Sequence, residues 1–250
     1  MVDFKFQRDP FSFSFASTRT GEMLIDTAEQ TFVYQKKFVQ IDMKIPSGHI
    51  YGFGEREANF ELGPGAWTMW SQDAKAEFDS GYGGKQLAGM HPFCLIKSNS
   101  SDEFFGIFFR SSNAQSPIIQ YADNQHILSY ITTGGNLDIN FFFRGSAKDV
   151  IAEYQQFIGL PKLPPFWAMG WHVAGDGWGS LQKVKDVVTS YKENNVPLES
   201  VWLDGNYMQD FSVFSVNSEF ADLKDFTNEL HQNDMKIVVQ LYGGLANEPD

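Results

Sequence analysis

The segment from residue 163 to residue 208 constrains the fold most, because it predicts two short strands joined by one helix. Residues 168–173 form one short apolar run, and residues 201–203 form a second run that ends at Asp204. Ser180 is a suitable N-cap for the helix between them. The apolar positions of that helix share one face: Leu181, Val184, Val187, Val188 and Tyr191. This order predicts parallel strands with a right-handed connection, and it places Asp204 at a strand's carboxyl end, where parallel α/β folds bind ligands.

A further helix at 223–233 and a third strand at 236–241 extend the same pattern. Three parallel strands suit either an open doubly wound sheet or a (β/α)8 barrel. Residues 175–179 (GDGWG) would be the phosphate-binding turn of the open sheet, but their spacing differs from that motif and Trp178 is too bulky for close backbone approach. A closed barrel needs eight strands. We therefore expect residues 146–250 to form the first three βα units of an incomplete (β/α)8 TIM barrel.

Residues 1–145 predict an N-terminal β-sandwich, because many short strands with turn signals between them follow one another. Phe11, Phe13 and Phe15 alternate with serines, which gives one apolar and one polar face. A helix begins after this region and leads into a proline-rich linker. The sequence thus predicts a first domain of residues 1–145 and a partial barrel domain of residues 146–250.

Composition excludes several classes of function. The net charge is −12 and no basic stripe occurs, so nucleic acid is not an expected partner. Cys94 is the one cysteine, which excludes an internal disulfide and thiolate metal sites. No apolar span approaches the length of a membrane helix. Aromatic residues make up 16% of the chain. They fit either a large β-rich core or a sugar-binding cleft, and both interpretations stay open.

Four segments together resemble glycoside hydrolase family 31, the α-glucosidase and α-xylosidase family. Residues 51–55 (YGFGE) resemble the family's YGxGE turn, and residues 89–93 (GMHPF) resemble its G-x-HPF segment. Residues 163–172 (LPPFWAMGWH) resemble the LPPxWALGFH opening of the family's barrel. Residues 201–208 (VWLDGNYM) resemble its WxDxDYM strand end. The order and spacing of the four segments make the resemblance specific.

The resemblance implies a galactose-mutarotase-like sandwich before the barrel, and a retaining hydrolase that cleaves α-glucosides at the non-reducing end without cofactor or metal. Its ligands would be α-linked glucosides or related oligosaccharides. In the family, the aspartate nucleophile and the acid/base follow barrel strands four and six, so both would fall beyond residue 250. We therefore expect no catalytic residue in this sequence and no hydrolysis by the chain alone.

The resemblance also suggests residues that bind substrate. Asp204 matches an aspartate that hydrogen-bonds sugar hydroxyls, and Trp202 matches an aromatic beside it. Asp73 matches an aspartate that a sandwich loop extends over the barrel mouth, and Trp178 lies where the family places another pocket tryptophan. His172 ends a predicted strand and is a further candidate for the pocket. A plain strand-end role for Asp204 and barrel packing for Trp202 stay open.

Three departures from the family pattern weaken the expectation of tight glucose binding. Asn206 replaces the second aspartate of WxDxDYM, and residues 242–243 replace the Asp-Pro usual after the third strand. The arginine usual in the loop after the first strand is missing from residues 173–178.

The rival interpretation is a non-catalytic module that binds carbohydrate or a partner protein, because the sequence contains only part of the barrel. A nucleotide-binding α/β protein is a third alternative. The open edge of an incomplete barrel would be able to pair with another chain. The first residues lack the layout of a signal peptide, but the start is compatible with truncation. The compartment is therefore undetermined from the sequence.

Overall fold

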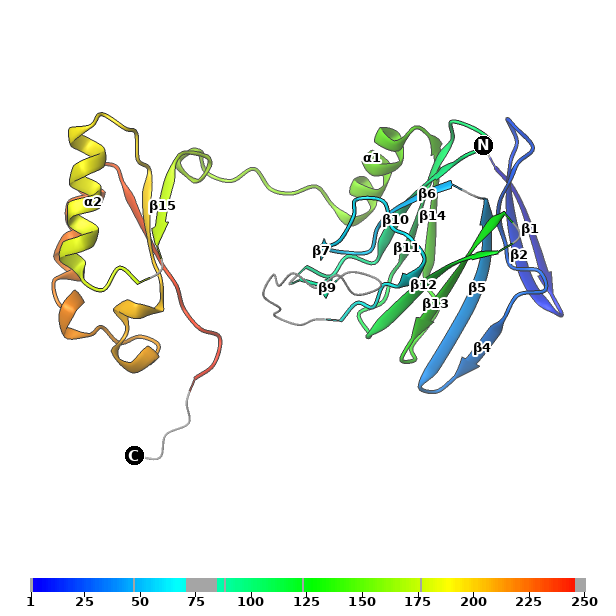
Figure 1. Cartoon of the computed structure of the whole chain (residues 1–250), viewed down its shortest axis with the longest axis horizontal. Helices are drawn as coiled ribbons and strands as arrows, with labels where there is room; N and C mark the ends of the chain where they lie inside the picture. The colour runs from blue at the N-terminus through cyan, green and yellow to red at the C-terminus, as the bar shows by residue number, and fades with distance from the viewer. Residues whose placement is uncertain are drawn as a thin grey trace. The chain divides into compact units, whose positions relative to one another are not determined.

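The computed structural model describes residues 2–46, 48–70, 85–87, 89–122, 124–175 and 177–245. The chain forms two compact units, Met1–Leu160 and Pro161–Asp250, which are coloured blue to green and green to red in Figure 1. The predicted sandwich and the predicted parallel strands lie in separate units. Each unit has a hydrophobic core of its own.

The first unit is built from two antiparallel sheets. The larger sheet has the order β1-β2-β3-β5-β13-β12-β8, with β4 beside β5. Its strands are β1 (Val2–Arg8), β2 (Phe11–Ser17), β3 (Met23–Asp26), β4 (Phe32–Gln35), β5 (Phe38–Pro46), β8 (Gly65–Ala66), β12 (Gln115–Ala122) and β13 (Gln125–Thr132). The smaller sheet has the order β14-β11-β10-β6. Its strands are β6 (Gly48–Gly52), β10 (Phe93–Ser98), β11 (Phe104–Phe109) and β14 (Ile139–Gly145). The short strands β7 (Arg56–Glu57) and β9 (Lys85–Gln86) form a separate pair.

Alternation of apolar and polar residues explains why the two sheets pack together. In β5, every second residue is buried: Val39, Ile41, Met43 and Ile45. The smaller sheet adds buried residues from β10 and β11, and Phe109 stacks on Tyr130 of the larger sheet with ring centroids 4.0 Å apart. Many of the phenylalanines therefore belong to the core, and the predicted β-sandwich is confirmed.

Helix α1 (Ala147–Ile158) belongs to the sandwich unit. Ser146 caps it by accepting a hydrogen bond from the Asp149 amide at 3.2 Å. Tyr154 stacks on Phe93 with centroids 4.1 Å apart, and its hydroxyl lies 2.7 Å from Nε2 of His91. Burial lowers the pKa of His91. The compact units thus divide between Leu160 and Pro161, whereas the sequence placed the boundary near residue 146, because the apolar face of α1 packs on β10, β11 and β14.

The second unit contains three parallel strands in the order β15-β16-β17. They are β15 (His172–Gly175), β16 (Ser200–Leu203) and β17 (Lys236–Val239), and the helices α2 (Leu181–Glu193) and α3 (Leu223–Gln232) connect them. Short 3-10 helices cover Phe166–Met169, Gly205–Tyr207, Gln209–Phe211 and Ser218–Phe220. The helices bury Val201 and Leu203 on one face of the sheet. No helix among the described residues is long and apolar enough to cross a membrane.

The predicted bounds of the first parallel strand were wrong. Residues 168–173 were expected to form it, but Phe166–Met169 is a 3-10 helix and the strand begins at His172. The amide of Ala168 donates to the carbonyl of Pro165 at 2.9 Å, which closes the turn. Proline fixes its own φ near −65°, so the proline pair before Phe166 favours such a turn over an immediate strand.

Gly106 is the position at which the close approach of α1 to the sandwich is most easily tested. A methyl group at Gly106 would lie 2.8 Å from the Phe93 ring and 2.9 Å from Cγ1 of Val150 in α1. We expect Gly106→Ala to lower the free energy of unfolding by about 1–3 kcal/mol, because Phe93 and Val150 are both buried in the packed core. Urea unfolding followed by far-UV circular dichroism measures the change.

Gly63→Ala is the matched control, because a methyl group there meets no atom within 4 Å. We expect its effect to stay within about 0.5 kcal/mol. Equal stability of the two variants would contradict the packing described for α1.

Candidate functional site

The register of the three parallel strands brings the candidate residues to one face. His172 is paired with Ser200, and Ala174 is paired with Trp202, which in turn is paired with Val238. Directly paired residues point to the same side of a sheet. Since Val201 and Leu203 of β16 point toward α2 and α3, Ser200 and Trp202 point to the other face, where the 3-10 helix Phe166–Met169 contacts His172 and Trp202 stays exposed.

A concave space of about 610 Å³ lies over the carboxyl half of this face. Its lining residues are Ala174, Gly175, Trp202, Leu203, Asp204, Val238, Val239 and Gln240. Asp204 is the one charged residue among them. A single carboxylate at the rim of an apolar wall beside an indole ring suits a ligand that has both hydroxyl groups and apolar C–H faces.

Asp204 is half-buried and accepts three hydrogen bonds. Its Oδ2 accepts from the Gly177 amide at 2.7 Å and from Nδ2 of Asn206 at 2.9 Å. Its Oδ1 accepts from the Asn206 amide at 3.0 Å, which caps the 3-10 helix Gly205–Tyr207. A carboxylate has about four lone-pair sites, so about one remains for a ligand. Asp204 therefore caps the 3-10 helix at the end of its strand, and it also lines the concave space.

His172 holds the indole of Trp202 in place. The Nε1 of Trp202 donates to Nδ1 of His172 at 2.9 Å, and Oγ of Ser200 lies 2.7 Å from the same nitrogen. Because an indole nitrogen can only donate, Nδ1 accepts and Nε2 carries the ring hydrogen. That Nε2 lies 3.1 Å from the carbonyl oxygen of Trp167. Both ring nitrogens are therefore occupied, while Trp202 remains 45% exposed.

Trp178 has a supporting position. Its side chain is 7% exposed and belongs to the core of the second unit. Its Nε1 donates to the carbonyl of Trp202 at 2.9 Å, and its ring packs against Gly175. Trp178 and His172 do not line the concave space. Asp73 lies outside the described residues. The structure thus brings together Asp204, Trp202, His172 and Trp178, with the first two at the surface.

Two further residues hold the site: Asn217, which was not singled out from the sequence, and Tyr242, which the sequence marked only as a departure from the family pattern. Nδ2 of Asn217 donates to the carbonyl oxygens of Asn206 at 2.7 Å and Met208 at 3.3 Å. The ring of Tyr242 covers Gly205, where an added methyl group would lie 2.5 Å from the Tyr242 hydroxyl. The Asn-Ser-Glu sequence at 217–219 was a usable signal for the first residue, because an asparagine before a helical turn often caps it.

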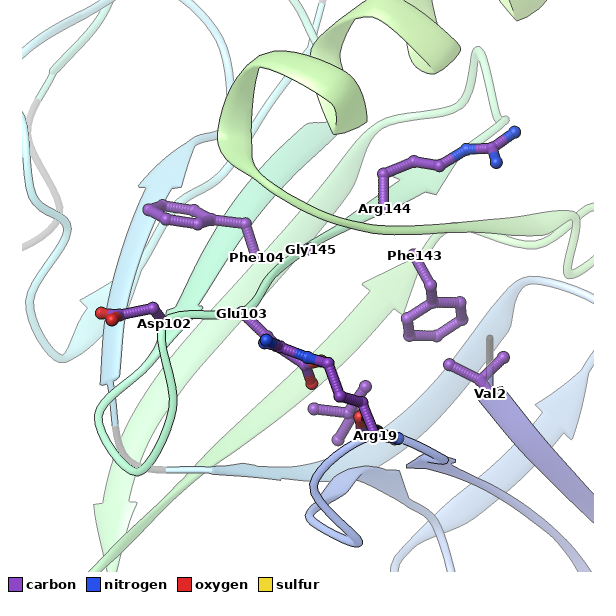
Figure 2. Close-up of a pocket in the computed structure, with 10 residues that line it drawn as sticks. Val2, Arg19, Asp102, Glu103, Phe104, Phe143, Arg144 and Gly145 are labelled. Carbon is purple, nitrogen blue, oxygen red and sulfur yellow. Dashed lines mark hydrogen bonds and ion pairs between the residues drawn. The ribbon is translucent and has the colours of Figure 1, made fainter.

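A second concave space of about 490 Å³ lies in the sandwich unit and is shown in Figure 2. Arg19 and Glu103 point toward one another there, with Nε and Oε1 2.7 Å apart. Burial by itself would raise the pKa of Glu103, but hydrogen bonds from Arg19 and Ser17 outweigh it and hold the pKa below its ordinary value. This pair joins two loops of the sandwich. Among the described residues, no cluster of three or more His, Cys, Asp or Glu is placed to hold a metal ion.

Comparison with known proteins identifies relatives of both units. Residues 3–115 match the glycosyl hydrolase 31 N-terminal galactose mutarotase-like domain, and residues 161–249 match the glycosyl hydrolases family 31 TIM-barrel domain. Intestinal sucrase-isomaltase of Homo sapiens is 30% identical over 245 residues, which are 96% of this chain and 13% of that protein. Lysosomal alpha-glucosidase of Mus musculus is 30% identical over 239 residues, which are 94% of this chain and 24% of that protein.

Solved structures show the same fold. The glucosidase II alpha subunit bound to alpha3-Glc2 matches 99% of this chain, with a TM-score of 0.86 and 18% identity, and the match covers 32% of that subunit. A dextranase of Flavobacterium johnsoniae complexed with glucose matches 96% of this chain, with a TM-score of 0.78 and 19% identity, and the match covers 29% of that chain. The chain therefore spans about a third or less of these relatives.

Asn206 offers a test of how the Asp204 carboxylate is held. We expect Asn206→Ala to lower the free energy of unfolding by about 1 kcal/mol, because one hydrogen bond to a carboxylate is lost. We expect Asn206→Asp to be less stable than the alanine variant at neutral pH, because two carboxylates would then lie side by side. Urea unfolding followed by tryptophan fluorescence measures both changes.

The salt dependence separates charge repulsion from a simple packing defect. Salt screens the repulsion between two carboxylates, so the stability gap between the aspartate and alanine variants should narrow as the ionic strength rises. A gap that stays constant from low to high salt would contradict the contact between residue 206 and Asp204.

Proposed function

The chain belongs to glycoside hydrolase family 31, and we propose that its second unit supplies part of the sugar-binding wall of a retaining α-glucosidase. It carries the family's N-terminal sandwich and the beginning of its TIM barrel. Relatives that are about 30% identical include glucosidases. We further propose that the reaction to which this wall contributes is the hydrolysis of non-reducing-end α-glucosides.

The observation that carries the proposal is the position of Asp204 beside Trp202 on the concave face. A carboxylate accepts charge-assisted hydrogen bonds from sugar hydroxyls, and an indole ring covers the apolar C–H face of a pyranose. Since three donors already occupy Asp204, we propose that it accepts one sugar hydroxyl instead of a vicinal pair. The other hydroxyl groups of the sugar then need hydrogen-bond acceptors from other residues, and Asp73 remains a predicted acceptor.

We assign supporting roles to the two remaining candidates. His172 orients the indole of Trp202 by accepting its Nε1 hydrogen, and Trp178 fixes the backbone at the same residue from the core side. Neither is proposed to touch the sugar. The residues of this sequence include no proposed nucleophile or acid/base, because the family resemblance places both after later barrel strands. In a retaining enzyme those two carboxyl groups would lie about 5 Å apart.

We also propose that further strands pair with the ends of the three-stranded sheet. Within the described residues, β15 and β17 each pair along one edge only. Unpaired strand edges favour strand addition, and the added strands would come from further barrel sequence or from another chain. A non-catalytic role in carbohydrate binding is the second candidate function, and it is supported by the same concave face.

Sugar binding is the first test of the proposal. We expect glucose and maltose to shift the indole Nε1–H resonance of Trp202 in 1H–15N spectra, with dissociation constants in the millimolar range, about −4 kcal/mol. Asp204→Ala should abolish the shift, whereas Asp186→Ala should keep it, because Asp186 is exposed on α2 away from the concave face. No shift with either sugar would refute the binding role of this face.

Because Asp204 also holds two loops, its alanine variant needs a check on folding. Trp202→Ala leaves the hydrogen bonds of Asp204 in place and should also lose binding, since the apolar wall is removed. Because this variant lacks the indole resonance itself, titration calorimetry with glucose and maltose measures its binding. Far-UV circular dichroism and the thermal midpoint of each variant show whether the fold is retained.

Catalysis is the second test. We expect the 250-residue chain to release no nitrophenol from a chromogenic α-glucoside above the buffer rate. Turnover that disappears in Asp204→Ala but persists in Asp186→Ala would mean that the chain holds its own catalytic pair, and the assignment of the catalytic carboxyl groups to later strands would then be wrong.

A further inference from the structure

Strand β1 leaves one of its edges free at the end of the larger sheet. Among the described residues it pairs with β2 only, and Figure 1 shows the two strands in dark blue at that end. Phe4 and Phe6 are 55% and 58% exposed. A free edge with large exposed aromatic side chains is a template for pairing with another strand, unless charges or bulges protect it.

The sandwich is open beside this edge. A concave space of about 360 Å³ is lined by apolar residues alone: Phe4, Phe6, Phe11, Phe13, Phe15, Ile41, Leu137, Ile139 and Phe141. Phe4 stacks on Phe15 with centroids 4.9 Å apart, and Phe6 meets the edge of Phe11 at 5.9 Å. The apolar inner face of the sheet therefore continues to its last strand instead of ending under a polar rim.

We propose that β1 pairs antiparallel with β1 of a second copy of this chain, with Phe4 opposite Phe4. The strand has seven residues, Val2–Arg8, in which Phe4 and Phe6 occupy one face while Asp3 and Lys5 occupy the other. A two-fold axis through such a strand joins the two sheets into one and brings both open apolar faces side by side.

Charge decides the register. Directly opposite residues share a face, so a register that places Phe opposite Lys would put charged side chains on the apolar face. Centring on Lys5 sets two lysines against each other, and centring on Phe6 sets Phe4 against Arg8. Centring on Phe4 sets Asp3 against Lys5 twice and Val2 against Phe6. Of the pairings that keep most of the strand, only this one matches opposite charges and apolar residues together.

This self-complementarity is the reason for choosing a second copy as the partner. The chain as a whole has a net charge of −12, which would favour a basic partner. The edge itself carries both signs, Asp3 and Lys5, at the spacing that an antiparallel copy satisfies. Interfaces below about 1,200 Å² are weak, and one strand from each copy makes a small interface. We therefore expect a reversible dimer that forms as the protein concentration rises.

Charge reversal tests the register. We expect Asp3→Lys and Lys5→Asp, each alone, to raise the dimer dissociation constant roughly tenfold, because two attractive cross-strand pairs become repulsive. The double variant Asp3→Lys/Lys5→Asp should restore the parent value, since both pairs are attractive again. Sedimentation velocity over a concentration series of the 250-residue chain measures all four proteins. Identical dissociation constants for the parent and the single variants would overturn the proposal.

Cross-linking tests the same geometry independently. Phe4→Cys places two thiols opposite each other in the dimer and should form a disulfide-linked dimer under mild oxidation. Phe6→Cys is the matched control, because its partner would be Val2, and it should cross-link much more slowly. The native Cys94 is fully buried and does not compete. Equal cross-linking of both variants would contradict the register.

Hydrogen exchange of the β1 amides tests whether the free edge is covered by a second copy or by another segment of the same chain. In the proposed dimer, the outward amides of β1 become protected only as concentration rises. Protection at every concentration, in a protein that sediments as a monomer, would mean that another segment of the same chain covers the edge, and the dimer proposal would be wrong. The inference concerns the sandwich unit alone and does not depend on the proposed sugar site.

Discussion

The hydrogen bonds of the Asp204 carboxylate connect the two loops on which the candidate site depends. One oxygen binds the backbone of the loop after β15 through Gly177, and both oxygens bind Asn206 in the loop after β16. Parallel strands do not fix the loops at their ends, since those loops leave the sheet in irregular conformations. A charged acceptor shared by two loops stabilises their relative position more than a neutral one would. The aspartate is thus structural first, and its remaining acceptor capacity is what a ligand can use.

The same hydrogen bonds explain in physical terms what Asn206, which departs from the family pattern, does in this chain. From the sequence, the loss of a second carboxylate suggested weaker sugar binding. In the structure, the side-chain amide of Asn206 donates to Asp204, which a carboxylate at residue 206 could do only if it carried a proton. The asparagine therefore changes the acceptor capacity of Asp204 as well as the local charge. The effect of Asn206 on ligand binding therefore depends on how many hydrogen bonds Asp204 can still accept from sugar hydroxyl groups.

Sequence reasoning predicted elements more reliably than side-chain environments. Alternation in β5 and the one-sided apolar pattern of α2 are local, so the sandwich and the strand–helix–strand order followed from them. The environment of Trp178 was not local: its burial depends on Gly175 and on a carbonyl 24 residues away. The Gly177 amide could not be identified either, because a backbone donor carries no residue signal. The partner of α1 could not be read from the sequence for a similar reason: its apolar stripe did not say which sheet it covers, and in the structure it packs on β10, β11 and β14.

The unpaired strand edges of the two units differ in the charged residues that they carry. The strand β17 (KIVV) has one charged residue followed by three apolar ones, so its edge has little to specify the register of a neighbour. A barrel supplies that register through its closed geometry and the helices outside it. The edge of β1 alternates Asp3 and Lys5 with phenylalanines, which specifies both partner and register without a barrel. An edge such as that of β17 needs the rest of its fold to position a neighbouring strand. An edge such as that of β1 is able to pair selectively with a copy of itself.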